Sequence, residues 1–344
     1  MTRVPPMKTA AVLPCGWRGP GLLALAGLLL VTVLASLAIG AQALAPSAVW
    51  QALWHPDGGR NAVIVWQLRV PRTVMGAGVG AALGTAGALM QALTRNPLAD
   101  PGLLGVNAGA GLAVVLGITF FGASGLSDDT GLALLGAALA AGCVLTLDRV
   151  GTPGSGEVRL VLGGAAISAS IHAGIGVLTL SNSATFDSYR FWVVGSLNRA
   201  IPGGFGVIGA SVLVTLALVM PLGGAMNAMA LGDDLVHSLG VAVGRMRALV
   251  FVAIVILCGT ATAVAGPIAF LGLVVPHVVR LLIGPDWRWI LPYSVLIGAG
   301  LLVVGDILGR VIAPPGEIEA GIVTAFMGAP LLLWLVTRRR GGGS

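Results

Sequence analysis

The stretch MQALTRNPLADPGLLGVNAG, residues 90–109, decides the fold, because it is a polar turn set between two long apolar runs. Arg95, Asn96 and Asp100 are too costly to leave in hydrocarbon, so the turn is expected at a membrane face. Pro97 and Pro101 prevent one continuous helix through it. Glycines then recur every three or four residues and allow the next helix to approach its neighbours closely. The stretch therefore predicts two membrane helices joined by a sharp turn.

The composition of the whole chain supports the same fold class. Hydrophobic residues make up 56% of the 344 residues and charged residues only 9%, whereas soluble domains carry about 25% charged residues. The chain also has 53 glycines, which suit helix contacts in lipid. The net charge of +6 does not indicate a nucleic-acid partner, because the basic residues lie mainly in turns between apolar runs. We predict an all-α, polytopic membrane protein in contact with lipid.

The apolar runs predict ten membrane helices in a single domain, residues 22–337. They cover residues 22–39, 73–93, 103–121, 131–147, 160–180, 205–220, 248–264, 267–283, 290–308 and 318–336. Gly266-Pro267 and Pro276 interrupt the eighth run, so that helix is expected to be short or broken. The first run is interpreted as a retained helix that follows an N-terminal segment, residues 1–21. The tail, residues 338–344, ends in a GGGS sequence typical of a flexible linker.

Lysine and arginine residues predict the orientation of the helices. If the N-terminus is cytoplasmic, the predicted inner segments hold 13 of the basic residues and the outer segments hold 6. This bias favours cytoplasmic positions for both termini. An outer segment, residues 181–204, is too short to span and is expected to form a half-helix or to lie at the interface.

Residue counts exclude several activities for this chain. Its one lysine, Lys8, precedes the first helix, so it has no P-loop and is not expected to hydrolyse ATP or to be an enzyme. Cys15, Cys143 and Cys258 have no metal-binding spacing, and no cofactor is expected on the chain. Because acidic residues lie in loops or at helix ends, an ion-coupled secondary transporter is disfavoured, although it remains the alternative class.

Three segments resemble the membrane subunits of ABC importers for ferric siderophores, haem and vitamin B12, the FecCD-type permeases. They are residues 90–109, 230–241 and 266–280, within a resemblance that covers about residues 60–337. It implies a type II ABC importer permease in a bacterial inner membrane. It also implies a second permease subunit, identical or paralogous, two ABC ATPases that carry ATP and magnesium, and an extracytoplasmic substrate-binding protein. A ferric siderophore is the expected cargo, with cobalamin and haem as alternatives.

The resemblance also implies a docking role for three arginines on the predicted outer face. Arg69 and Arg72 precede the second helix and Arg310 ends the ninth. A guanidinium pairs with a carboxylate in a planar, bidentate way, which suits acidic residues on a binding protein. The alternative is that these side chains reach lipid phosphates. The family often has Glu-x-Pro-x-Gly before the last helix, whereas this chain has Glu317 without the proline.

Two further groups of residues receive roles from the resemblance. The segment 222–247 contains a polar stretch, ALGDDLVHSLGV at 230–241, that resembles the loop by which such permeases contact an ATPase. The coupling residues predicted there are Leu231, Gly232, Asp233, Asp234, Ser238, Leu239 and Gly240. Asn96 and Leu98 match positions that narrow the inner mouth of the pathway, or else they cap the turn. Independently of the resemblance, Ser168 and His172 either line a polar pathway or form hydrogen bonds between helices.

Overall fold

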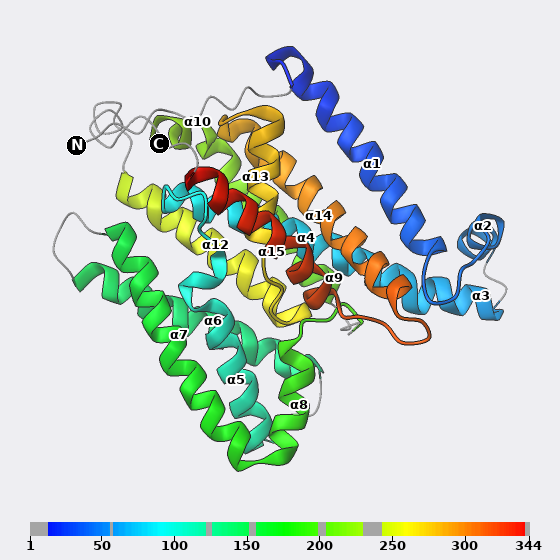
Figure 1. The fold of residues 1–344 in the computed structure, drawn as a ribbon, viewed down its shortest axis with the longest axis horizontal. Helices are drawn as coiled ribbons and strands as arrows, with labels where there is room; N and C mark the ends of the chain where they lie inside the picture. Colours follow the sequence, from blue (N-terminus) through cyan, green and yellow to red (C-terminus); the bar gives the residue numbers. More distant parts are fainter. Residues whose placement is uncertain are drawn as a thin grey trace.

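The computed structural model of the protein describes residues 13–55, 58–121, 126–150, 156–198, 204–229 and 243–340. Within these ranges the regular elements are helices, and the longest of them form one bundle (Figure 1). In chain order the α-helices are α1 (Arg18–Ala38), α2 (Pro46–Trp54), α3 (Arg60–Val63), α4 (Val70–Leu93), α5 (Val106–Phe121), α6 (Leu126–Val150), α7 (Gly156–Ser181), α8 (Ser183–Val193), α9 (Gly204–Val219), α10 (Gly223–Met229), α12 (Val243–Ala265), α13 (Leu271–Ile283), α14 (Trp287–Ile312) and α15 (Ala320–Arg340). Short elements complete the list: the 3-10 turns η1 (Cys15–Trp17), η3 (Pro101–Leu104) and η4 (Met220–Leu222), and a π-helical segment, η2 (Ile64–Arg69).

Ten of the described helical segments correspond to the ten predicted membrane helices. Seven are long and apolar enough to cross a membrane: Cys15–Ala38, Arg60–Leu93, Thr130–Leu147, Leu160–Ser181, Gly204–Ala228, Val243–Ala265 and Trp287–Ile312. Three shorter apolar helices overlap the remaining predicted spans: Val106–Phe121, Leu271–Ile283 and Ala320–Leu333. The predicted fold class, an all-α polytopic membrane protein, is confirmed.

The core of the bundle is α4, which packs against α14, α12, α13 and α9. Its neighbours come this close because glycines remove the side chains at the crossings. A methyl group on Gly80 would overlap the carbonyl of Gly298 in α14, and one on Gly87 would overlap the carbonyl of Gly272 in α13. A methyl group on Gly84 would lie 2.8 Å from the carbonyl oxygen of Ser294. The packing at the centre of the protein is therefore contact between helix backbones.

The start of α13 differs from the predicted start at residue 267. Gly266 and Phe270 both have left-handed backbone, with φ of 74° and 67°, so residues 266–270 form a loop and the helix begins at Leu271. Pro276 lies inside the helix without ending it. The helix is short, as expected: of the two predicted interruptions, Gly266-Pro267 lies in the loop before the helix, whereas Pro276 does not end it.

The two ends of the bundle differ in what lies there. Figure 1 shows the start of α1 and helix α10 at one end, with α2 and α3 at the other. We call these the inner end and the outer end, following the orientation predicted from charge. Helix α1 lies at the edge of the bundle, and large apolar side chains such as Leu23, Leu28 and Val31 are exposed along it.

Candidate functional site

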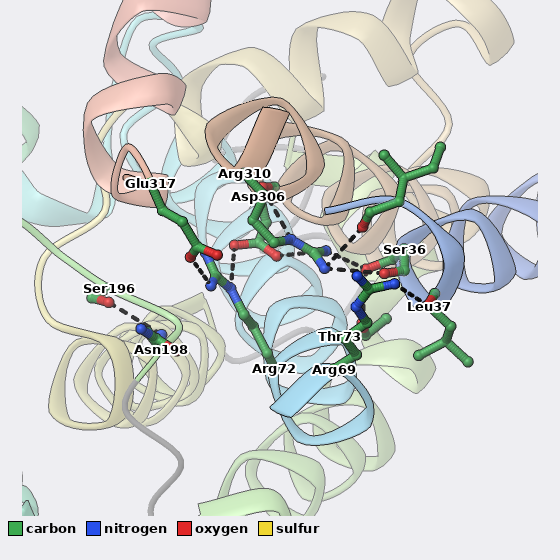
Figure 2. Close-up of polar contacts among 11 residues, drawn as sticks. Ser36, Leu37, Arg69, Arg72, Thr73, Ser196, Asn198, Asp306, Arg310 and Glu317 are labelled. Atoms are coloured by element: carbon green, nitrogen blue, oxygen red, sulfur yellow. Dashed lines mark hydrogen bonds and ion pairs between the residues drawn. The ribbon is translucent and has the colours of Figure 1, made fainter. Parts of the chain in front are cut away.

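The outer end of the bundle holds a cluster of charged side chains where α1, α4 and α14 meet (Figure 2). Arg69 is the last residue of η2, and Arg72 lies three residues later in the first turn of α4. Residues three apart on a helix share a face, so both guanidiniums reach the same space. Arg310 reaches it from the last turn of α14. The three arginines predicted to dock a binding protein are thus brought together.

Asp306 is the centre of this outer arginine cluster. Its Oδ1 accepts a hydrogen bond from Nε of Arg72 at 2.8 Å, and its Oδ2 lies 2.9 Å from an NH2 nitrogen of Arg310. Arg72 also pairs with Glu317, which lies on the segment between α14 and α15. The side chain of Asp306 is only 1% exposed, so water screens these charges little. One buried carboxylate therefore holds two buried cations.

The cluster also binds the C-terminal end of α1. Arg310 donates to the carbonyl oxygen of Ser36 at 3.0 Å and to its hydroxyl group. Arg69 donates to the carbonyl oxygen of Leu37 at 2.6 Å and to that of Gln42. The last carbonyls of a helix lack partners within the helix and carry partial negative charge, so arginine cations stabilise this end.

The arginines are less accessible than the docking prediction assumed. Arg69, Arg72 and Arg310 are 6%, 7% and 3% exposed, and the bonds above join them to groups of this chain. The partly exposed member of the cluster is Glu317, with 33% of its side chain accessible. Docking by these arginines stays a prediction. Asp306 was not among the predicted site residues, although its spacing of four residues from Arg310 was a usable signal.

The polar turn after α4 is held by its own side chains. The side-chain oxygen of Asn96 accepts from the backbone N–H of Leu98 at 3.0 Å, and Asp100 caps η3 by accepting from the N–H of Gly102 at 2.8 Å. Burial raises the pKa of the Asp100 carboxyl group, while the hydrogen bond from Gly102 opposes this change. This hydrogen bond supports the interpretation that Asn96 caps the turn, whereas its role in narrowing the inner mouth of the pathway stays a prediction.

A cavity of about 390 Å³ lies between α5, α7, α8 and the loop before α13. Ser168 and His172, the two predicted pathway residues, both line it, one helical turn apart on α7. Nδ1 of His172 lies 2.7 Å from the carbonyl oxygen of Ser168. Because a carbonyl only accepts, Nδ1 is the donor in this contact.

Three residues that the sequence analysis did not assign to a pathway add polar and aromatic surface to this cavity. Asn107, at the start of α5, accepts from the hydroxyl group of Thr262 at 2.8 Å. Tyr189 and Trp192 of α8 also line the cavity, and their rings stack with centroids 6.0 Å apart. Burial raises the pKa of Tyr189, which keeps its hydroxyl group neutral. The lining thus offers hydrogen-bonding groups and flat aromatic faces.

The predicted coupling residues lie outside the described residues, which break between 229 and 243. Helix α10 ends at Met229 and α12 begins at Val243, so both helices reach into the predicted coupling segment, 222–247, and flank its polar stretch, 230–241. Within the described ranges, no group of three or more His, Cys, Asp or Glu side chains is placed to hold a metal ion.

Comparisons with known proteins match nearly the whole chain. The model of the FecCD transport family matches residues 28–338. The ferric enterobactin transport system permease protein FepD of Escherichia coli (strain K12) is 44% identical, over 94% of this chain and 97% of its own length. The hemin transport system permease protein HmuU of Yersinia pestis is 37% identical, over 91% and 94%.

A solved structure has the same fold. It is described as a metal-chelate type ABC transporter in an inward-facing conformation, and it matches with a TM-score of 0.82 and 27% sequence identity. The match covers 93% of this chain and 99% of that one. The resemblance recognised in the sequence is confirmed: this chain belongs to the FecCD transport family.

Proposed function

We propose that this chain is half of the membrane pore of an ATP-driven importer in a bacterial inner membrane, and that its cargo is a ferric siderophore. The observation that carries this proposal is the similarity along almost the full chain to a ferric enterobactin permease. The 37% identity to a hemin permease keeps haem as the second cargo to test, and cobalamin remains a third. ATP hydrolysis would take place on two partner ATPases, and a binding protein would deliver the cargo.

The residues around the cavity beside α7 are suited to line part of the cargo pathway. Within this cavity, Asn107, Tyr189 and Nε2 of His172 can exchange hydrogen bonds with a chelate. The indole of Trp192 offers a face to its aromatic or apolar parts. These four residues offer polar and aromatic groups but no carboxylate. Such a surface suits a bulky chelate that must pass without being held tightly.

The outer arginine cluster is the proposed docking surface for the binding protein. Glu317 is the partly exposed acidic partner of Arg72. A carboxylate of a docked protein can replace Glu317 beside that guanidinium without leaving the cation unpaired, because Asp306 remains bonded to it. Asp233 and Ser238 are the proposed contacts to the ATPase at the other end.

The test is uptake of radiolabelled iron, presented as ferric enterobactin, by cells with and without this chain. Labelled haem and cobalamin run in parallel. We expect loss of siderophore iron uptake alone, restored by the wild-type chain but not by Asp233→Ala combined with Ser238→Ala. Loss of haem or cobalamin uptake instead would identify that compound, and not a ferric siderophore, as the cargo. Full restoration by the double variant would favour an ion-coupled transporter, which needs no ATPase contact.

Replacing Ser168 with tryptophan is expected to reduce cargo uptake at least about tenfold. The indole would fill much of the cavity of about 390 Å³ and displace the chelate from the His172 side. The measurement is uptake per unit of membrane-inserted protein. Leu28→Trp is the matched control, because Leu28 is 61% exposed on α1, at the edge of the bundle. Equal uptake by the two variants would argue against a pathway through this cavity.

A further inference from the structure

A second polar cluster lies at the inner end, where α14 begins. Asp286 caps α14 by accepting from the backbone N–H of Arg288 at 3.2 Å. The same carboxylate accepts from Nδ2 of Asn227 at 2.8 Å and from Arg18 at 3.2 Å. Asn227 in turn accepts the backbone N–H of Trp287 at 2.9 Å. This inner cluster joins the first residue of α1, the short helix α10 and the start of α14.

Asn227 makes the side-chain link between α10 and α14. It bonds the start of α14 twice, once as donor and once as acceptor, so its amide orientation is fixed by both contacts. The backbone of α10 also lies against α14, because a methyl group on Gly223 would lie 3.3 Å from Cα of Arg288. Helix α10 ends at Met229, directly before the polar stretch 230–241 of the proposed coupling segment. A displacement of α10 would therefore reach the start of α14 through these contacts.

The far end of α14 carries the outer arginine cluster. Asp306 and Arg310 belong to the last two turns of the helix that Asp286 caps. Helix α1 runs beside α14 and is bonded to it at both ends, through Arg18 to Asp286 and through Ser36 to Arg310. Two parallel connections thus join the inner and outer clusters, each through one continuous helix. A pair of helices bonded at both ends offers a contiguous route by which a displacement at one cluster can reach the other.

We propose that Asn227 is a positioning residue that couples the ATPase contact to the binding-protein dock through α14 and α1. This inference rests on the proposed function and adds the route by which the two faces communicate. Asn227 touches neither cargo nor nucleotide; it holds α10 in register with α14. Breaking its two bonds leaves each site intact and weakens the energetic link between them. Coupling between sites is commonly worth a factor of about 5 to 150, and we expect an effect within that range.

The test is ATP hydrolysis by the complete importer in lipid nanodiscs, with and without binding protein loaded with ferric enterobactin. For Asn227→Ala we expect basal hydrolysis within about twofold of wild type and stimulation by the loaded binding protein reduced about tenfold. The double exchange Asn227→Asp with Asp286→Asn restores the bond between the two side chains with donor and acceptor reversed. It gives up the cap on the Arg288 N–H, which the same Asp286 oxygen accepts, so it is expected to recover part of the stimulation. Thr146→Ala is the control, because it removes one exposed side-chain hydrogen bond within α6.

Each outcome of this experiment bears on the proposal. Unchanged stimulation in Asn227→Ala would overturn it, and so would an equal fall in basal and stimulated hydrolysis, since that indicates a structural role. If Asn227→Ala does not assemble, Asn227→Ser is measured in its place and judged by the same outcomes, because the serine side chain is too short to make both bonds. A wild-type complex that no loaded binding protein stimulates would contradict the proposed function itself. A stimulated wild type beside a fully stimulated Asn227→Ala would contradict this inference alone.

Discussion

Replacing Asp306 with alanine is expected to destabilise the folded protein by about 3–5 kcal/mol. The substitution removes the carboxylate shared by Arg72 and Arg310 and leaves two buried guanidiniums facing each other. Glu317 still pairs with Arg72, but Arg310 then keeps only α1 groups such as Ser36 and its own helix carbonyl. The measurement is the unfolding temperature and the monodisperse fraction of the purified chain in detergent.

An exposed ion pair provides the control for this substitution. Asp187 lies 3.2 Å from Arg190 in α8, and their side chains are 60% and 53% exposed. Surface pairs contribute about 0–1 kcal/mol, so Asp187→Ala is expected to leave the unfolding temperature nearly unchanged. If the two aspartate variants lose similar stability, the outer arginine cluster is not the anchor described here.

Substituting Gly80 with alanine is expected to lower the free energy of unfolding by about 3 kcal/mol or more, which is the second large effect. The added methyl group meets the carbonyl of Gly298, which is backbone and cannot move aside by a rotamer change. Helices α4 and α14 must therefore separate, and the contacts along their whole length weaken. The same unfolding measurement checks this expectation.

The matched variant is Gly206→Ala in α9. A methyl group added at Gly206 would have no neighbouring atom within 4 Å, and alanine has a higher helix propensity than glycine. We expect no loss of stability from it. Equal losses at Gly80 and Gly206 would show that the loss comes from the glycine-to-alanine change itself and not from the α4–α14 crossing.

Much of the fold could be predicted from the sequence, because hydrocarbon imposes a strong and local constraint. A run of apolar residues must form a helix in lipid, so all ten spans appear in the residue pattern alone. The start of α13 could not be found this way, since the left-handed backbone of Phe270 is unusual for a non-glycine residue. Helix α2 was also missed, because it is too short and too rich in polar neighbours to resemble a span.

The sites could be predicted less completely. The sequence indicates that Arg69, Arg72 and Arg310 share one face, because all three lie at helix ends of the same predicted orientation. It does not reveal that the three arginines are buried. Their burial depends on Asp306 and on the end of α1, two parts of the chain that are more than two hundred residues apart. The same holds for Asn227 and Asp286, whose bond has no local sequence pattern.

The attachment of α1 at both ends also bears on how the protein meets bilayers of different thickness. Its 21 residues span about 32 Å at about 1.5 Å per residue, close to the hydrocarbon thickness of about 30 Å. A free helix of this length adjusts to a thinner or thicker bilayer by tilting. With Arg18 bonded at one end and Ser36 at the other, α1 keeps the angle set by α14. The lipid must then adapt to the protein, so local deformation of the bilayer around α1 takes the place of tilt.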